Sequence, residues 1–295
     1  MQTRSNAQQI GEDPLGQVDL CFVVDTTGSM GSFLTAARER LAETVAALAA
    51  EADVRVRFGL VEFRDHPPQE RTFVTRVHPF TDDAEAIRRV LNGLSAVGGG
   101  DGPEAVYDGV HDACTKMAWR PHACRFALLV GDAPPHGIRA HEQRGSEGEA
   151  AGKGARAARN AGGDYPCPCG LDLHQVAAAA EANGVVLHAL CMGAWAETVA
   201  SFTALATGTG GTCVPSGNAG AVIAAVRRVL AHEFGRLPLD RRALAVVRER
   251  AGDCDTRALA EALDVPRAEA AAALARLGRR GLLDAYLPPL TPVAV

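Results

Sequence analysis

The segment DTTGSM at residues 25–30 constrains this chain most, because it joins an apolar strand to a helix and gathers oxygen ligands at the junction. Before it, residues 18–24 form an apolar run typical of a buried parallel strand. After it, apolar residues recur at helical spacing through residues 31–51. A carboxylate and two hydroxyls therefore stand at alternating positions and can point to one spot above the strand end: Asp25, Thr27 and Ser29. Such hard oxygen ligands suit Mg²⁺, and a metal-free Ser/Thr helix cap is the alternative.

Two later segments also place acidic residues in a loop beside a predicted strand or helix. The sequence GGGDGPE at residues 98–104 precedes an apolar helical stretch at residues 105–117; its glycines permit a tight loop, and its proline suits a first helical turn. Residues 125–130 have the pattern of another central strand, and Asp132 follows that strand closely. An acidic residue just beyond the carboxyl end of a strand lies where open α/β sheets bind ligands.

In this order the three segments resemble the three metal loops of von Willebrand factor A domains, whose metal-ion-dependent adhesion site begins with the pattern D-x-[S/T]-x-S. The resemblance implies that Asp25, Thr27 and Ser29 supply the first loop and Asp132 the third. In the second loop many A domains present Thr, whereas this chain has Asp101, as in a subset with a GGGD-x-PE loop. The implied cofactor is Mg²⁺ or Mn²⁺, and Asp101 binds it either directly or through water.

The position of Asp101 affects what such an ion could do. Two carboxylates about neutralise a divalent cation, which then still attracts the carboxylate of a partner. A third carboxylate in direct contact would weaken that attraction and make the ion structural. We favour a recognition role over a structural one.

Composition is consistent with a two-domain protein without a bilayer-spanning segment. The chain has 295 residues, a net charge of -5 and 47% hydrophobic residues. No stretch reaches the ~18 apolar residues that would span a bilayer, and the polar residues 1–17 have no apolar signal region. The eight cysteines are scattered, and two fall in predicted core strands, which favours reduced thiols and a cytoplasmic location.

Strands and helices alternate along residues 17–236, which predicts a doubly wound, mostly parallel sheet flanked by helices, as in A domains and Rossmann folds. Residues 1–16 are predicted to be a polar N-terminal tail. Further strands are expected at residues 54–61, 72–77 (an edge strand), 185–191 and 211–214. Further helices are expected at residues 82–94 (with Thr81 as N-cap), 172–183, 197–206 and 219–234.

A long insert at residues 137–170 is predicted to lie beside the metal site. It ends in a Cys-Pro-Cys motif, and two histidines flank it. A secondary zinc or redox site could therefore combine Cys167, Cys169, His136 and His174. We favour the alternative, in which a proline-stiffened loop packs unligated thiols. His188, in a predicted strand, is expected to be a core histidine.

Residues 237–295 are predicted to form a small α-rich domain. Helices are expected at residues 237–251, 257–263 (capped by Thr256) and 267–280, followed by a short strand at 281–287. Residues 259–283 resemble winged helix-turn-helix modules of bacterial regulators. The candidate contacts to a nucleic acid or a partner are Arg267, Arg276, Arg279 and Arg280. Because the expected recognition helix is rich in alanine, we favour protein contact, including self-association, over DNA.

The sequence therefore predicts a cytoplasmic, metal-dependent protein-interaction module rather than an enzyme. A partner Asp or Glu carboxylate would complete the coordination of the metal. The family resemblance suggests a scaffold within a bacterial multi-protein signalling or conflict system. The alternative is a transcription regulator whose A domain senses a metal or ligand and whose C-terminal winged helix binds DNA.

Overall fold

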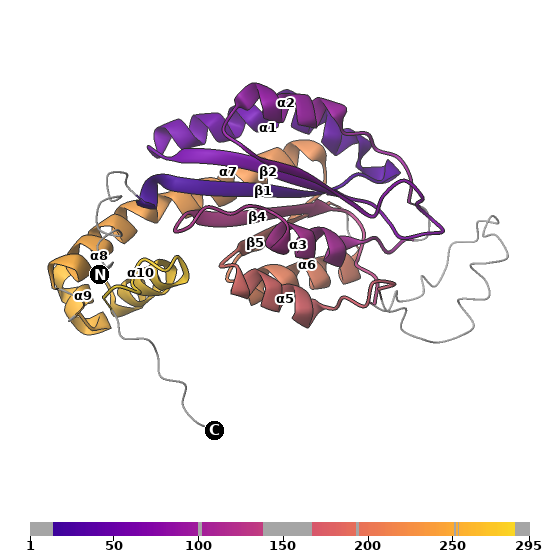
Figure 1. Cartoon of the computed structure of the whole chain (residues 1–295). Coiled ribbons are helices and arrows are strands. Elements are labelled where there is room, and N and C mark those ends of the chain that lie inside the picture. Colours follow the sequence, from indigo (N-terminus) through magenta and orange to yellow (C-terminus); the bar gives the residue numbers. More distant parts are fainter. Residues whose placement is uncertain are drawn as a thin grey trace, which may run out of the picture.

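The computed structural model describes residues 14–99, 102–137, 167–192, 195–250, 252 and 254–286. Within these residues, a six-stranded sheet with the order β3-β2-β1-β4-β5-β6 forms the centre of the larger domain (Figure 1). Every neighbouring pair of strands is parallel except β2 and β3, so the prediction of a mostly parallel sheet is confirmed. The strands are β1 (Gln17–Asp25), β2 (Arg55–Phe63), β3 (Thr75–Thr81), β4 (Cys124–Gly131), β5 (Val186–Met192) and β6 (Cys213–Ser216).

Helices cover both faces of the sheet. One apolar core lies under α1 (Gly31–Glu51), α2 (Ala84–Gly93) and α7 (Ala219–Gly235). The other lies under α3 (Val106–Thr115), α5 (Leu173–Ala182) and α6 (Ala196–Gly208). No helix among the described residues is long and apolar enough to cross a membrane.

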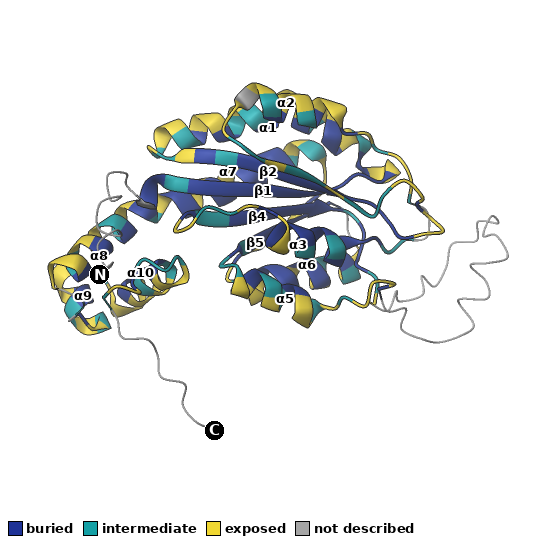
Figure 2. Ribbon diagram, viewed as in Figure 1, coloured by how far each residue is buried: buried dark blue, intermediate teal, exposed yellow. Residues whose placement is uncertain are grey.

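The central strand β1 is apolar because helices cover it on both sides. Leu20, Phe22 and Val24 point into the core beneath α1, whereas Cys21 and Val23 point into the opposite core. All five are at most 1% exposed, and the strands are dark throughout the middle of the sheet (Figure 2). This burial fixes the register of β1 and places its last residue, Asp25, at the carboxyl edge of the sheet.

The strand predicted at residues 72–77 begins later than expected. It is an edge strand, as predicted, but it spans Thr75–Thr81. The Glu70 carboxylate accepts hydrogen bonds from the backbone N–H groups of Arg71 and Thr72 and from the Thr72 hydroxyl, at 2.7–2.8 Å. These bonds hold the backbone of residues 71–72 around the Glu70 carboxylate and keep it out of the sheet.

Two predicted helix caps also differ by one or two residues. Asp83, rather than Thr81, caps α2, because its side chain accepts a hydrogen bond from the backbone N–H of Glu85. Asp255, rather than Thr256, caps α9 in the same way. In both cases a carboxylate accepts a helix N–H near the positive end of the helix dipole.

The C-terminal part consists of three helices: α8 (Leu237–Glu249), α9 (Thr256–Leu263) and α10 (Arg267–Arg279). Leu259, Leu263 and Leu277 belong to the apolar core that these helices share. The strand predicted at residues 281–287 is wrong for residues 281–286, which form turns. The described residues between 237 and 286 therefore form a three-helix unit without the predicted wing.

The predicted N-terminal tail is partly structured, because Pro14–Gly16 form a 3-10 turn beside α8. Leu15 is 1% exposed and belongs to the same apolar core as Leu259 and Leu277. The C-terminal core therefore includes a residue that precedes β1, and residues 237–286 alone would lack part of it.

His188 on β5 is a buried core histidine, as expected from the sequence. Its Nδ1 accepts a hydrogen bond from the backbone N–H of Thr212 at 3.2 Å, and its ring lies 6.0 Å from that of Phe126. Burial, assisted by the positive charges of Arg236 and His232, lowers the pKa of His188 from 6.5 to about 4.

This pKa predicts a pH dependence of stability. Above pH 6.5 the imidazole is neutral in both the folded and the unfolded chain, so it does not affect stability. As the pH decreases from 6.5 to 4, only the unfolded chain takes up the proton, and the folded state therefore becomes less stable. We expect the wild type to lose on the order of 3 kcal/mol relative to His188→Gln across this window. Urea unfolding at pH 7.5 and 4.5 measures the difference in stability between the wild type and His188→Gln. If this difference is the same at both pH values, the lowered pKa of His188 is contradicted.

Candidate metal site and its surroundings

The first predicted metal loop forms a compact turn after β1. Asp25 is 1% exposed, and its Oδ1 accepts hydrogen bonds from the Thr27 backbone N–H (2.8 Å) and the Thr27 hydroxyl (2.6 Å). The Ser29 hydroxyl lies 3.5 Å from that of Thr27. The alternating spacing therefore brings one carboxylate and two hydroxyls together, as the sequence predicts.

The surroundings of Asp25 disfavour its charged form. Its Oδ2 is buried and has no hydrogen-bond partner among the described residues. Burial raises the pKa of Asp25 to about 7; the Thr27 hydrogen bonds oppose this rise, and the negative charge of Asp132 adds to it. A buried carboxylate with an unused oxygen and a second carboxylate nearby suits a divalent ion with oxygen ligands.

Asp132 follows the last residue of β4 and lies at the same edge of the sheet as Asp25. Ser29 donates a hydrogen bond to its carboxylate, and burial raises the pKa of Asp132. Four of the five predicted ligands, Asp25, Thr27, Ser29 and Asp132, are thus brought together. The fifth, Asp101, lies outside the described residues.

The described part of the second loop packs directly on the first. The backbone N–H of Gly28 donates to the carbonyl of Gly98 at 3.1 Å. Gly99 has φ +79°, and a Cβ there would lie 2.7 Å from Glu104 Oε1 and 3.1 Å from Thr27 Cβ. Glycine is therefore required for this close approach, as the GGG run suggests.

A buried arginine that was not predicted from the sequence hydrogen-bonds to these loops. Arg64 follows β2, and its guanidinium donates to the Thr26 hydroxyl (3.3 Å), to the Ser95 carbonyl (3.1 Å) and to Glu70 (3.2 Å). Its carbonyl accepts from the N–H of Ala105 at 2.8 Å. Because β2 lies beside β1, a charged residue just after β2 falls at the same sheet edge, and this rule could have identified Arg64.

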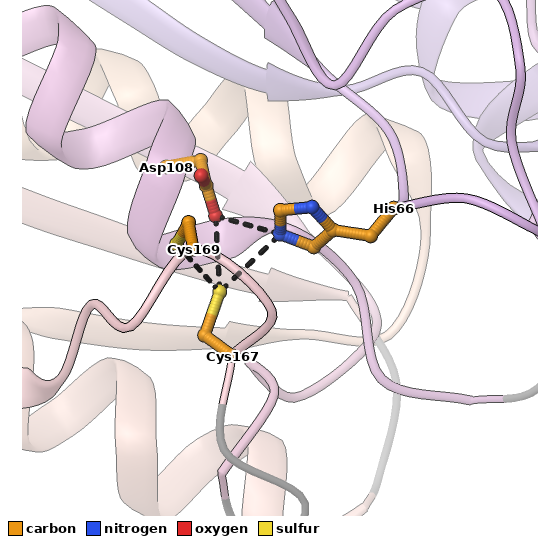
Figure 3. A group of neighbouring side chains, drawn as sticks. All are labelled: His66, Asp108, Cys167 and Cys169. Atoms are coloured by element: carbon orange, nitrogen blue, oxygen red, sulfur yellow. Dashed lines mark hydrogen bonds and ion pairs between the residues drawn. The ribbon is translucent and has the colours of Figure 1, made fainter.

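A second group of side chains lies next to Arg64. Figure 3 shows His66, Asp108, Cys167 and Cys169 pointing toward one another, with ligand atoms all within 4.8 Å. The two cysteines belong to the predicted secondary site, and His66 and Asp108 were missed. Burial raises the pKa of both thiols.

The histidines predicted to flank these cysteines lie elsewhere. His136 Nε2 hydrogen-bonds to Asp65 Oδ1 at 2.7 Å, and its ring stands 5.4 Å from that of His66. His174 is exposed on α5 and does not belong to the group. These histidines were predicted from their nearness to the insert, whereas the histidine that contacts the cysteines is His66, about 100 residues before them.

Three of the four C-terminal arginines predicted to contact a nucleic acid or a partner form hydrogen bonds within this chain. Arg276 donates to the Asp240 carboxylate at 2.6–3.1 Å. Arg280 donates to the carbonyl of His122 at 2.8 Å, and Arg279 to that of Thr209 at 3.4 Å. Arg267, the fourth of the set, is exposed at the start of α10, and Arg279 is exposed near its end.

These contacts place α10 against the edge of the sheet opposite the metal loops. His122 and Thr209 precede β4 and β6, and a Cβ on Gly184, which precedes β5, would lie 3.0 Å from the carbonyl oxygen of Arg279. The amino ends of parallel strands share one edge, so the C-terminal helices and the metal loops occupy opposite ends of the strands (Figure 1).

Comparisons with known proteins agree with this geometry. Residues 19–140, which include all the predicted metal ligands, match the family model of the von Willebrand factor A domain. The alpha-protein kinase vwkA of Dictyostelium discoideum is 31% identical over 130 residues, covering 44% of this chain and 20% of that protein. A putative ariadne-like RING finger protein, R811, of Acanthamoeba polyphaga mimivirus is 29% identical over 119 residues, covering 40% and 11%. The matched segment thus spans a fifth or less of each relative.

A solved structure shows the same fold. The pilus adhesin SpaC of Lactobacillus rhamnosus GG, in its open conformation, superposes with a TM-score of 0.52 at 16% identity. The match covers 75% of this chain and 30% of the adhesin. Together, the family match and the likeness of fold support a von Willebrand factor A domain in this chain.

Proposed function

We propose that this chain is a divalent-cation-dependent protein-interaction module. The ion, Mg²⁺ or Mn²⁺, would be held by Asp25, Thr27, Ser29 and Asp132, with Asp101 in the second loop. The single observation that carries the proposal is the buried Oδ2 of Asp25, which has no partner among the described residues. Von Willebrand factor A domains are typically interaction modules, which agrees with this assignment.

The arrangement of the side chains suits recognition of an acidic group. Thr27 orients Asp25, and Ser29 orients Asp132, so both carboxylates are positioned before any ligand arrives. A divalent cation bound there would supply an electrophile for the carboxylate oxygen of a partner Asp or Glu. The two hydroxyls add no charge, so the described ligands do not over-neutralise the ion.

We further propose that the module is not an enzyme and acts in the cytoplasm as a scaffold of a bacterial signalling or conflict system, as the family resemblance suggests. The alternative, a DNA-binding regulator, has less support because three of its four candidate arginines bind this chain. Ala272 and Ala275 of the alanine-rich helix line a cavity shared with Arg125 and Gly184 of the larger domain, so part of that face is directed at the same chain.

Selection of displayed peptides tests the recognition chemistry. Peptides selected on the full chain in Mg²⁺ should be enriched in Asp or Glu, and EDTA should release them. Replacing the selected acidic residue by Asn or Gln, or Asp132 by Ala in the protein, should weaken binding at least tenfold. Peptides that bind equally well in EDTA, or that contain no required carboxylate, would contradict the proposal.

A further inference from the structure

The group formed by His66, Asp108, Cys167 and Cys169 has the composition of a metal site distinct from the first. His66 lies in the loop after β2, Asp108 in the first turn of α3, and the two cysteines just before α5. His66 Nε2 lies 3.0 Å from Asp108 Oδ2 and 3.2 Å from Cys167 Sγ. Cys167 Sγ lies 3.3 Å from Asp108 Oδ2 and 2.8 Å from Cys169 Sγ.

We propose that these four residues bind a structural Zn²⁺ ion. Two sulfurs, one imidazole nitrogen and one carboxylate oxygen are all accepted zinc ligands, and four protein ligands make a closed, structural site. Thiols favour zinc over Mg²⁺, whereas the all-oxygen set around Asp25 favours Mg²⁺. The two sites are therefore chemically separable.

Zinc binding would require a longer distance between the sulfurs of Cys167 and Cys169. In a tetrahedral site with Zn–S bonds of about 2.3 Å, two sulfurs stand about 3.8 Å apart, compared with 2.8 Å here. Cys169 is exposed, whereas Cys167 is only 4% exposed. Cys169 can therefore move outward by about 1 Å to open the space between the sulfurs, while Cys167 stays in place.

The surroundings support His66 as a fixed ligand. Asp65, which is fully buried, accepts hydrogen bonds from the backbone N–H of His66 at 2.6 Å and from His136 at 2.7 Å. The His136 ring packs against the edge of the His66 ring. These contacts hold the backbone of His66 and pack against its ring, so they restrict where the imidazole can point.

Zinc binding would connect the described residues just before α5 to the loop after β2. Residues 138–166 lie between His136, which binds Asp65, and Cys167, which contacts His66. Asp65 and His66, which are adjacent in the loop after β2, thus contact the described residues on either side of this segment. An ion joining Cys167 and Cys169 to His66 would fix this connection two residues after Arg64, which hydrogen-bonds to Thr26 in the first metal loop.

Metal analysis of the full-length protein tests the proposal. Protein purified without chelators under reducing conditions should contain about one zinc per chain, and Cys169→Ser should contain less than a tenth of that. Cys213→Ser replaces a partly buried cysteine outside the group and should keep its zinc. Cobalt substitution provides a second measurement: the wild type should show a thiolate-to-cobalt charge-transfer band that is weakened in Cys169→Ser and shifted in Asp108→Asn.

Several results would overturn the proposal. One is a wild type with less than a tenth of an equivalent of zinc and no cobalt–thiolate band. Another is a Cys167–Cys169 disulfide, seen as a mass loss in protein isolated under both reducing and non-reducing conditions. Because Cys169 is exposed, its substitution should leave the chain folded, and a retained Mg²⁺ response in Cys169→Ser would verify that. Failure of the Mg²⁺ response alone would count against the proposed function and leave the zinc site standing.

Discussion

Asp25→Asn is expected to abolish the stabilisation of this protein by Mg²⁺ without destabilising the metal-free form. A ligand that binds only the folded state adds about 2.7 kcal/mol when its concentration is 100 times Kd. Asparagine can still accept the Thr27 hydrogen bonds but cannot neutralise a cation. Since burial raises the pKa of Asp25 to about 7, its charge is costly in the absence of metal, and the variant should be at least as stable in EDTA at pH 8.

Thermal unfolding in Mg²⁺, Mn²⁺ and EDTA measures this effect. Asp82→Asn is the matched control, because Asp82 is an exposed carboxylate on the surface. It should keep the full metal response. A wild-type melting temperature that is the same in all three conditions would show that the loop is a metal-free cap, and a variant that is less stable in EDTA would show that Asp25 is mainly structural.

Asp19→Ala is expected to cause the largest loss of stability, about 3 kcal/mol. Asp19 is fully buried in β1, and its carboxylate accepts four hydrogen bonds at 2.7–2.9 Å from the Arg57 guanidinium and from the side chain and backbone of Arg120. Its removal leaves two guanidinium groups without their anion. Because both arginine side chains are about a quarter exposed, water recovers part of the cost, which places the expected loss at the lower end for buried pairs.

Chemical denaturation measures this loss, with Glu85→Ala as the surface control. Glu85 pairs with Arg88 on an exposed helix face, so its removal should cost less than about 0.5 kcal/mol. The Mg²⁺-dependent stabilisation of Asp19→Ala should be intact, because Asp19 and Asp25 are six residues apart on one strand, about 20 Å. A loss below about 1 kcal/mol would mean that Arg57 and Arg120 find other partners.

The sequence was sufficient to predict the shape of the first loop because its proposed ligands are contiguous with a strand. Once the apolar run before Asp25 identifies a buried strand, alternation places Thr27 and Ser29 beside it. The same rule located Asp132 after β4. Parallel strands end at one edge, so short-range patterns were enough to assemble ligands from distant segments.

The second group was harder to predict because its members belong to segments that only packing brings together. Cys167 and Cys169 attracted notice through their spacing, but nothing local links them to Asp108. His66 follows β2 and therefore lies at the same sheet edge as Asp132, so the rule used for Asp132 could have identified it. The docking of α10 depends on side-chain packing, and the arginine pattern alone did not distinguish partner contacts from contacts within the chain.

The length of the central strands sets the distance between the two ends of the molecule. β1 has nine residues and therefore eight steps of about 3.3 Å, so its ends are about 26 Å apart. A partner residue bound at the metal loops would therefore lie far from one bound at the C-terminal helices. A peptide that reached both ends would need a linker of at least about eight extended residues. Any cooperation between two such ligands would then depend on effective concentration, and so on the length of the tether joining them.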